Sequence, residues 1–217
     1  MFFEIVKSTD PKIVGKPSFH SDRMKVGYDY KKKNSVYNWK INDTPPDLDA
    51  ILLNEGAKLT DLLTCVPIGG KGSLVSDKLL GILTKFSMMK HVSFEPVILQ
   101  RDKQIDGYKY ISFNQKLSDE HVRFDLSKYV YLKRNSDGLF VENGRAKINS
   151  FGDLYSKNPQ VIRPRLKWIY LKPTFKFEVF PFKFSGQIIV TEKVKIACEQ
   201  EGIKGITFKP VEYLKSD

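Results

Sequence analysis

A stretch of sequence from Leu74 to Val97 recurs near the C-terminus, and this duplication constrains the fold more than any other feature of the chain. The first copy reads LVSDKLLGILTKFSMMKHVSFEPV, and the second, from Ile189 to Val211, reads IVTEKVKIACEQEGIKGITFKPV. Aligned with a one-residue gap in the turn, both contain the patterns V-[ST]-[DE]-K and F-x-P-V. A duplicated pattern of this length predicts one supersecondary unit that is used twice.

Each copy predicts a strand, a helix and a second strand. Ser76 or Thr191 follows an apolar pair and is expected to cap the helix by accepting a hydrogen bond from a free backbone amide. Asp77 and Glu192 place negative charge in the first helical turn, which the helix dipole favours. Gly202 suits a left-handed residue after the second helix. The apolar positions expected in the core are Leu79, Ile82, Leu83, Phe94, Val194, Ala197, Ile206 and Phe208.

The rest of the chain adds more strand patterns than helix patterns. Alternating or β-branched runs occur at 97–99, 108–113, 128–133 and 139–141, and glycine- and asparagine-containing turns separate several of them. No low-complexity linker divides the molecule. We therefore expect a single α+β domain over residues 1–217, with a mixed or antiparallel sheet and two lobes built on the units at about 74–97 and 189–211.

The formal net charge of +11 is the most unusual bulk property of the sequence. It is compatible with a nucleic acid, an anionic membrane surface or an acidic protein as partner, and equally with a lysine-rich surface that only maintains solubility. The N-terminus has no apolar run like that of a signal peptide, and no segment reaches the length of a membrane span. The two cysteines, Cys65 and Cys198, form no C-x-x-C motif and are expected to be reduced. We expect a cytoplasmic protein with no membrane partner.

The sequence contains no pattern that predicts catalysis, a cofactor or a metal site. The segment Gly69–Ser73 reads GGKGS, but Gly72 separates the lysine from the serine, so it lacks the spacing of a phosphate-binding P-loop. A turn before a strand explains it better. No serine lies in a G-x-S-x-G motif. The histidines are scattered without metal-ligand spacing, at His20, His91 and His121. We predict a protein that is not an enzyme, unless distant side chains converge in the fold.

Residues 157–183 combine positive charge with aromatic side chains and form the best candidate for a binding region. Cations beside aromatic faces often hold single-stranded nucleic acid. The segment KFEVFPF, however, lacks the glycines of an RNA-recognition motif, and aromatic residues at alternate positions also suit the buried face of a strand. Nucleic-acid binding through 157–183 is therefore the alternative hypothesis. The candidate partner-binding residues are Arg163, Arg165, Lys167 and Trp168.

Two segments resemble immunity proteins of bacterial polymorphic-toxin systems, namely the immunity protein 43 group or a related immunity family. They cover residues 48–100 and 175–211, about two fifths of the chain, and carry the strings KLTDLLTCVPIGGKGSLVSDKLLGIL, VSFEPVIL and VFPFKFSGQIIVTEKVKIACEQEGIKGITFKP. The resemblance implies a non-catalytic cytoplasmic protein that binds and neutralises a cognate protein toxin. Many immunity proteins are acidic because they mimic nucleic acid, whereas this chain is basic, so substrate mimicry against a nuclease is not expected.

Overall fold

Strands dominate the part of the chain that the computed structural model describes, and three short α-helices accompany them. The described residues are 1–16, 20–21, 23–36, 38–40, 44–49, 51–65, 72–154, 162–182 and 188–216. At this level the expectation of an α+β, sheet-rich fold is confirmed. The glycine-rich segment from Gly69 lies outside the described residues up to position 71.

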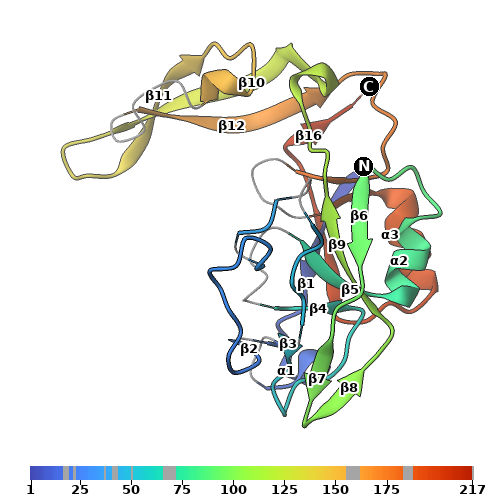
Figure 1. Ribbon diagram of the computed structural model, residues 1–217. Coiled ribbons are helices and arrows are strands. Elements are labelled where there is room, and N and C mark those ends of the chain that lie inside the picture. Colours follow the sequence, from blue (N-terminus) through green and yellow to red (C-terminus); the bar gives the residue numbers. More distant parts are fainter. Residues whose placement is uncertain are drawn as a thin grey trace. The chain divides into compact units, whose positions relative to one another are not determined.

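The chain divides into two compact units (Figure 1). Unit 1 consists of Met1–Phe2, Leu117–Lys176 and Pro210–Asp217, and unit 2 consists of Phe3–Lys116 and Phe177–Lys209. Both repeated stretches lie in unit 2, apart from the last two residues of the second. That the whole chain folds as one domain stays a prediction.

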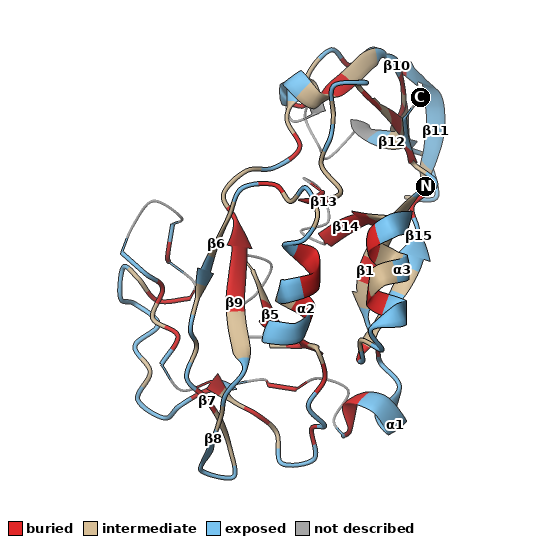
Figure 2. Ribbon diagram, turned by 90° about the vertical axis from the view of Figure 1, so that its right-hand side faces the viewer, coloured by how far each residue is buried: buried red, intermediate tan, exposed pale blue. Residues whose placement is uncertain are grey.

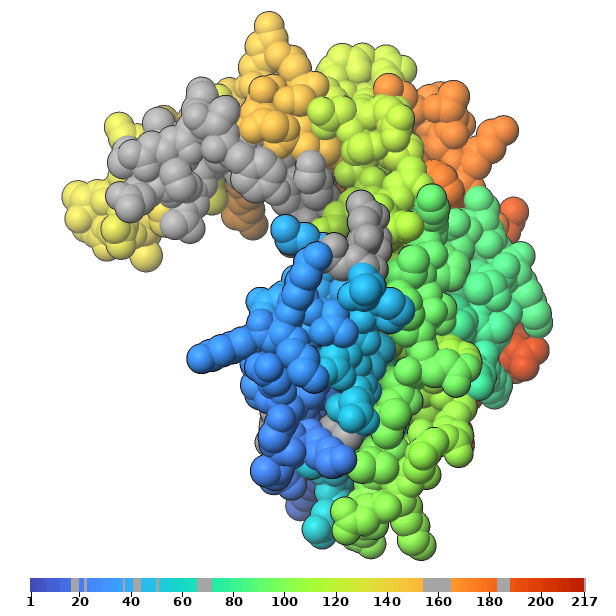
Figure 3. Space-filling view, viewed as in Figure 1, coloured from blue at the N-terminus to red at the C-terminus, as the bar shows by residue number. Residues whose placement is uncertain are grey.

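Unit 2 is built on small sheets with the strand orders β4-β5-β9-β6, β13-β14-β1-β15 and β2-β3-β7-β8. In the third sheet β3 runs parallel to β7, and Figure 3 shows the cyan segment of the chain beside the green segment. The strands are β1 (Phe2–Lys7), β2 (Arg23–Met24), β3 (Ile51–Leu52), β4 (Leu62–Leu63), β5 (Ser73–Ser76), β6 (His91–Phe94), β7 (Ile98–Gln100), β8 (Lys103–Ile105), β9 (Tyr108–Phe113), β13 (Val179–Pro181), β14 (Ile188–Thr191) and β15 (Ile206–Pro210). The helices are α1 (Pro11–Val14), α2 (Asp77–Leu83) and α3 (Glu192–Gln200).

The first two sheets share a connection pattern. In one, α2 joins β5 to β6, and β9 lies between these strands and is antiparallel to both. In the other, α3 joins β14 to β15, and β1 lies between them. Hydrogen bonds from Ser8 to Gly205 and from Val211 to Phe2 connect opposite ends of β1 and β15, which makes this pair antiparallel. In each sheet, therefore, a helix connects two strands, and a third strand from elsewhere in the chain lies between these two.

Both longer helices bury one face, as the colouring in Figure 2 shows for α2. They pack against each other, and the Lys78 ammonium donates a hydrogen bond to the Glu201 carbonyl at the end of α3. Gly202 follows with a φ of 64°, the left-handed conformation expected from the sequence. The predicted core positions Leu79, Ile82, Leu83 and Val194 are buried.

The other predicted core positions are only half-buried, and here the prediction was wrong. Phe94 and Phe208 lie on β6 and β15, which are the edge strands of their sheets. An edge strand has a neighbour on one side only, so its side chains retain contact with solvent. Phe94 nevertheless packs edge-on against Trp39, with 5.6 Å between the ring centroids. Half-buried positions in the second copy also include Ala197 and Ile206.

The two helix caps differ, although the sequence predicts the same role for both. The Ser76 hydroxyl accepts a hydrogen bond from the Leu79 amide at 3.0 Å and donates one to the Asp61 carboxylate at 2.6 Å. The Thr191 hydroxyl makes no capping bond to α3 and is buried without a hydrogen-bond partner. The expected side-chain cap is therefore present in α2 and absent from α3.

This difference predicts unequal costs for removing the two hydroxyls. We expect Ser76→Ala to lower the free energy of unfolding by about 1–2 kcal/mol, because it removes a cap and leaves the Leu79 amide unpaired. Thr191→Val keeps the shape of the side chain and should cost less than about 0.5 kcal/mol. Urea unfolding of both variants measures the difference. Equal losses would show that the two caps are equivalent in solution.

Unit 1 is one sheet with the order β11-β10-β12-β16. Its strands are β10 (Val122–Arg134), β11 (Phe140–Ala146), β12 (Ile162–Leu171) and β16 (Leu214–Lys215). Two short 3-10 helices accompany them, η2 (Asp119–His121) and η3 (Gly152–Leu154). β10 is antiparallel to β11 and to β12, whereas β16 runs parallel to β12. One face of the sheet is buried, where Tyr129 stacks with Phe124 and Phe124 meets Phe151 edge-on.

The edge strand β11 contains a bulge. Arg145 pairs with Val130 and Glu142 pairs with Leu132, so Asn143 and Gly144 together oppose a single residue of β10. Gly144 has a φ of 81°, a conformation that glycine adopts without strain, and this is the arrangement of a glycine bulge. The bulge keeps Glu142 and Arg145 on the same face of the sheet although they are three residues apart.

Candidate binding face

The candidate site is the face of the unit 1 sheet opposite its buried side. Trp168 of β12 lies directly across from Lys128 of β10, and Tyr170 lies across from Lys215 of β16. Directly paired residues in neighbouring strands share a face. Residues 168 and 170 are two apart in one strand, so all four side chains belong to the same face. We call this surface the basic face.

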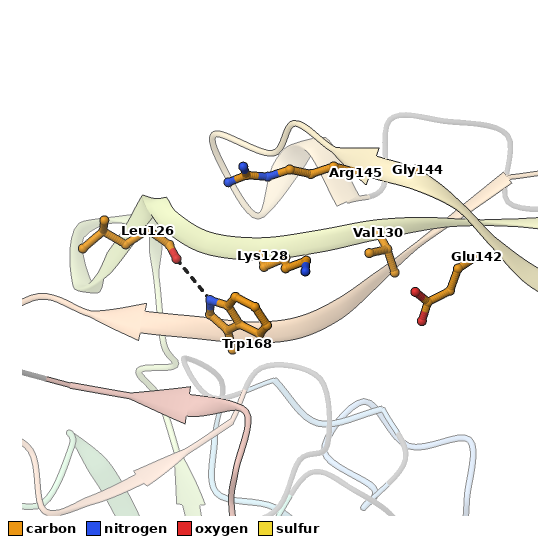
Figure 4. Close-up of a pocket in the computed structure, with 7 residues that line it drawn as sticks. All are labelled: Leu126, Lys128, Val130, Glu142, Gly144, Arg145 and Trp168. Atoms are coloured by element: carbon orange, nitrogen blue, oxygen red, sulfur yellow. Dashed lines mark hydrogen bonds between the residues drawn. The ribbon is translucent and has the colours of Figure 1, made fainter.

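Two lysines hold the Trp168 ring. The Lys128 ammonium lies 4.9 Å from the ring centroid and the Lys215 ammonium 4.6 Å, both within the range of a cation–π interaction. The indole N–H donates a hydrogen bond to the Leu126 carbonyl at 3.2 Å, which fixes the ring's orientation (Figure 4). An aromatic ring on an open face is thus locked in place, with positive charge beside it.

Further cations lie in the next rows of the same face. Arg145 of β11, Val130 of β10 and Arg165 of β12 form one row across the sheet. Glu142 of β11 forms an ion pair with Lys167, which sits at a register shift of β12. Positive side chains therefore come from every strand of this sheet: Lys128, Arg145, Arg165, Lys167 and Lys215.

The ionisation of Glu142 reports on this surrounding charge. The hydrogen bond from Lys167 is the largest effect that holds the pKa of this carboxyl below its usual range. The charges of Lys167, Arg165 and Lys128 act in the same direction. The electrostatic environment of Glu142 is therefore positive.

Between the strands the basic face forms an open depression of about 540 Å³. Figure 4 shows Lys128, Val130, Glu142 and Trp168 along its floor and sides. It combines an apolar floor with charged walls, a composition suited to a protruding side chain with an apolar stem and a negative end. The lining residues are Leu126, Lys128, Val130, Glu142, Gly144, Arg145 and Trp168.

The residues proposed from sequence belong largely to this face. Arg165 is exposed, and Lys167 and Trp168 are half-buried next to the depression. Arg163 pairs with Leu132 in the register of β12, and its side chain lies outside the described part of the structure. Sequence reasoning missed Lys128, Glu142, Arg145 and Lys215. The first three could have been found from the hairpin that β10 and β11 form, whereas the pairing of Lys215 depends on the tertiary fold.

Several other aromatic residues of the 157–183 region lie away from the basic face. Phe180 and Phe182 are buried within unit 2, and Phe175 packs edge-on against His121 in unit 1. The alternative hypothesis, that such residues belong to the buried face of a strand, is thus correct for Phe180 on β13, whereas Phe182 is buried directly after that strand. Residues 155–161 and position 183 lie outside the described residues.

No protein-family model matches the chain, and no curated protein matches it significantly. Within the described residues, no three His, Cys, Asp or Glu side chains are grouped so that they could hold a metal ion. No described helix has the length and apolar character needed to span a membrane. Cys65 and Cys198, which are both described, are not joined by a disulfide bond, and burial raises the pKa of Cys198 to about 11.

Proposed function

We propose that this chain is a non-catalytic cytoplasmic protein that binds a cognate protein toxin and neutralises it. The observation that carries the proposal is the basic face, where a fixed tryptophan lies among cations on an open sheet. Tryptophan and arginine are enriched among residues that dominate protein–protein binding energy. The resemblance of residues 48–100 and 175–211 to immunity proteins supports the toxin as the partner.

The basic face suggests how such binding proceeds. Cations from every strand of the sheet attract an acidic surface and raise the rate of encounter. Trp168 and the exposed Leu126 then offer apolar area beside the depression. An interface of standard size, about 1,600 Å² in total, is large enough to cover an active site or hold a toxin in an inactive conformation.

We also infer that the segments 74–97 and 189–211 are two copies of one strand–helix–strand unit that forms the scaffold of unit 2. The shared connection pattern, with β9 or β1 inserted between the outer strands, supports this inference. A superposition of the two segments in an experimental structure tests it. Helices of different orientation relative to their strands would contradict it.

Charge reversal on the basic face tests the proposed function. We expect the double variant Arg163→Glu and Arg165→Glu to slow association with the cognate toxin by about tenfold at ~150 mM salt. Dissociation should change less than about threefold, because rim charges act mainly on encounter. Surface plasmon resonance measures both rates. The control is Lys85→Glu with Lys90→Glu, two exposed lysines of unit 2 that give the same net charge.

Nucleic-acid binding is the second candidate function, and the lysines beside Trp168 are the observation that favours it. In this case affinity must fall steeply with salt, because each neutralised phosphate releases counterions. Fluorescence anisotropy with single-stranded RNA and DNA distinguishes the two functions. Sub-micromolar binding at ~150 mM salt that the two arginine reversals abolish would replace the protein partner with a nucleic acid.

A further inference from the structure

We propose that the Glu142 carboxylate occupies, in the free protein, the subsite that an aspartate or glutamate of the partner takes in the complex. This inference rests on the proposed function and deepens it, because it specifies the chemistry of the partner's contacting group. The subsite consists of Lys167, which forms the ion pair with Glu142, and of Arg165 and Lys128, which the strand register places on the same face of the sheet as Glu142.

The ion pair at this subsite is accessible enough to exchange. The Glu142 side chain is 47% exposed and the Lys167 side chain 33% exposed. Glu142 stands on the edge strand β11, next to the bulge at Gly144, and its carboxylate can turn toward solvent without moving the sheet. An exposed ion pair contributes little to stability, so a partner's carboxylate can displace it at little cost.

The ligand class that fits is a carboxylate on a protein surface rather than a phosphate chain. The ring of Trp168 already has lysine ammonium groups within 5 Å of its centroid, so a base that stacks on it would have to displace them. Glu142 also places one negative charge beside Lys167, whereas a phosphate backbone carries several. A single acidic side chain, in contrast, replaces Glu142 one for one. The exposed Leu126 beside it suits an apolar neighbour of that acidic residue.

Replacement of Glu142 tests the inference. The variant Glu142→Gln keeps the shape of the side chain but frees the three cations, so we expect poly-L-glutamate to bind about three- to fivefold more tightly than to wild type. This gain in affinity for poly-L-glutamate should be lost when Arg165→Gln and Lys167→Gln are added to Glu142→Gln. The matched control is Glu95→Gln in unit 2, which also removes the carboxylate of a Lys–Glu ion pair, here with Lys109 of β9, and raises the net charge equally.

Tryptophan fluorescence provides a local readout. Trp39 is buried in unit 2, whereas Trp168 lies on the basic face, so binding there should protect Trp168 from acrylamide quenching. Equal gains for Glu142→Gln and Glu95→Gln would overturn the inference, since the effect would then follow net charge alone. A greater gain for oligo-dT than for poly-L-glutamate would also overturn it. Neither result decides whether the chain binds a toxin. Capture of the toxin tests that proposed function and is measured separately.

Discussion

Replacing Phe180 with alanine is expected to lower the free energy of unfolding by about 3–5 kcal/mol. The Phe180 ring is completely buried on β13, opposite Ile189 of β14. β13 is the last strand of its sheet, but its outer side is covered, because the Met89 amide donates a hydrogen bond to the Val179 carbonyl at 2.9 Å. Truncation of the ring therefore leaves a cavity that solvent does not reach.

The matched control is Phe208→Ala on β15, the opposite edge strand of the same sheet. Because Phe208 is half-buried, we expect this variant to lose less than about 2 kcal/mol, less than the same truncation costs in a core. Chemical denaturation followed by circular dichroism measures both losses. A larger loss for Phe208→Ala than for Phe180→Ala would contradict the assignment of the core in unit 2.

The buried His20 gives the second large effect. Its Nδ1 accepts a hydrogen bond from the Thr64 amide at 2.9 Å, so the proton resides on Nε2, which lies 3.0 Å from the Lys58 carbonyl. Nε2 also lies 3.2 Å from the Thr60 hydroxyl. We expect His20→Ala to lower the free energy of unfolding by about 2–4 kcal/mol, because it removes the partner of the buried Thr64 amide and of the part-buried Lys58 carbonyl and leaves a cavity.

His20 also makes the stability of the protein depend on pH. Burial is the main cause that lowers the pKa of this imidazole below its ordinary value of 6.5. The unfolded chain therefore binds a proton more readily, and stability falls as pH decreases from about 6.5 toward the folded-state pKa, by at most about 1.4 kcal/mol per pH unit. Above that range the contribution is complete. Burial also lowers the pKa of His121, which adds a loss of the same sign.

Urea unfolding of wild type and His20→Gln at several pH values between about 5 and 7.5 measures this dependence. The variant should have the shallower slope, with part of the slope retained through His121. If the unfolding free energies of the variant and of wild type depend equally on pH, the protonation of His20 is not coupled to unfolding.

Local patterns predicted the elements of unit 2 better than its tertiary burial. The Ser76 cap, the acidic first turns and the left-handed Gly202 follow from interactions within a few residues of each helix. The burial of Phe180 and the partial exposure of Phe208 depend instead on which edge strand of the sheet is covered by another segment of the chain. The periodicity of a single strand cannot predict which segment covers it, because that segment is distant in sequence.

The candidate site shows the same division. Arg165, Lys167 and Trp168 attract notice in the sequence because charge and an aromatic residue are adjacent there. Their partners Glu142 and Lys215 come from β11 and the C-terminal strand β16, and only strand pairing brings them together. The division of the chain into two compact units had no counterpart in the sequence, since no linker composition marks its boundaries.

The bulge in β11 has a consequence for self-association. β11 ends the unit 1 sheet, its residues are largely exposed, and no described strand pairs with its outer side (Figure 2). A straight exposed edge of this kind is a template on which a second chain can add a strand and begin an aggregate. The extra residue at Asn143–Gly144 interrupts the regular spacing of free N–H and C=O groups, and the charges of Glu142 and Arg145 flank the interruption. The same kink that presents a carboxylate to the basic face thus discourages other copies of the chain from stacking onto the sheet.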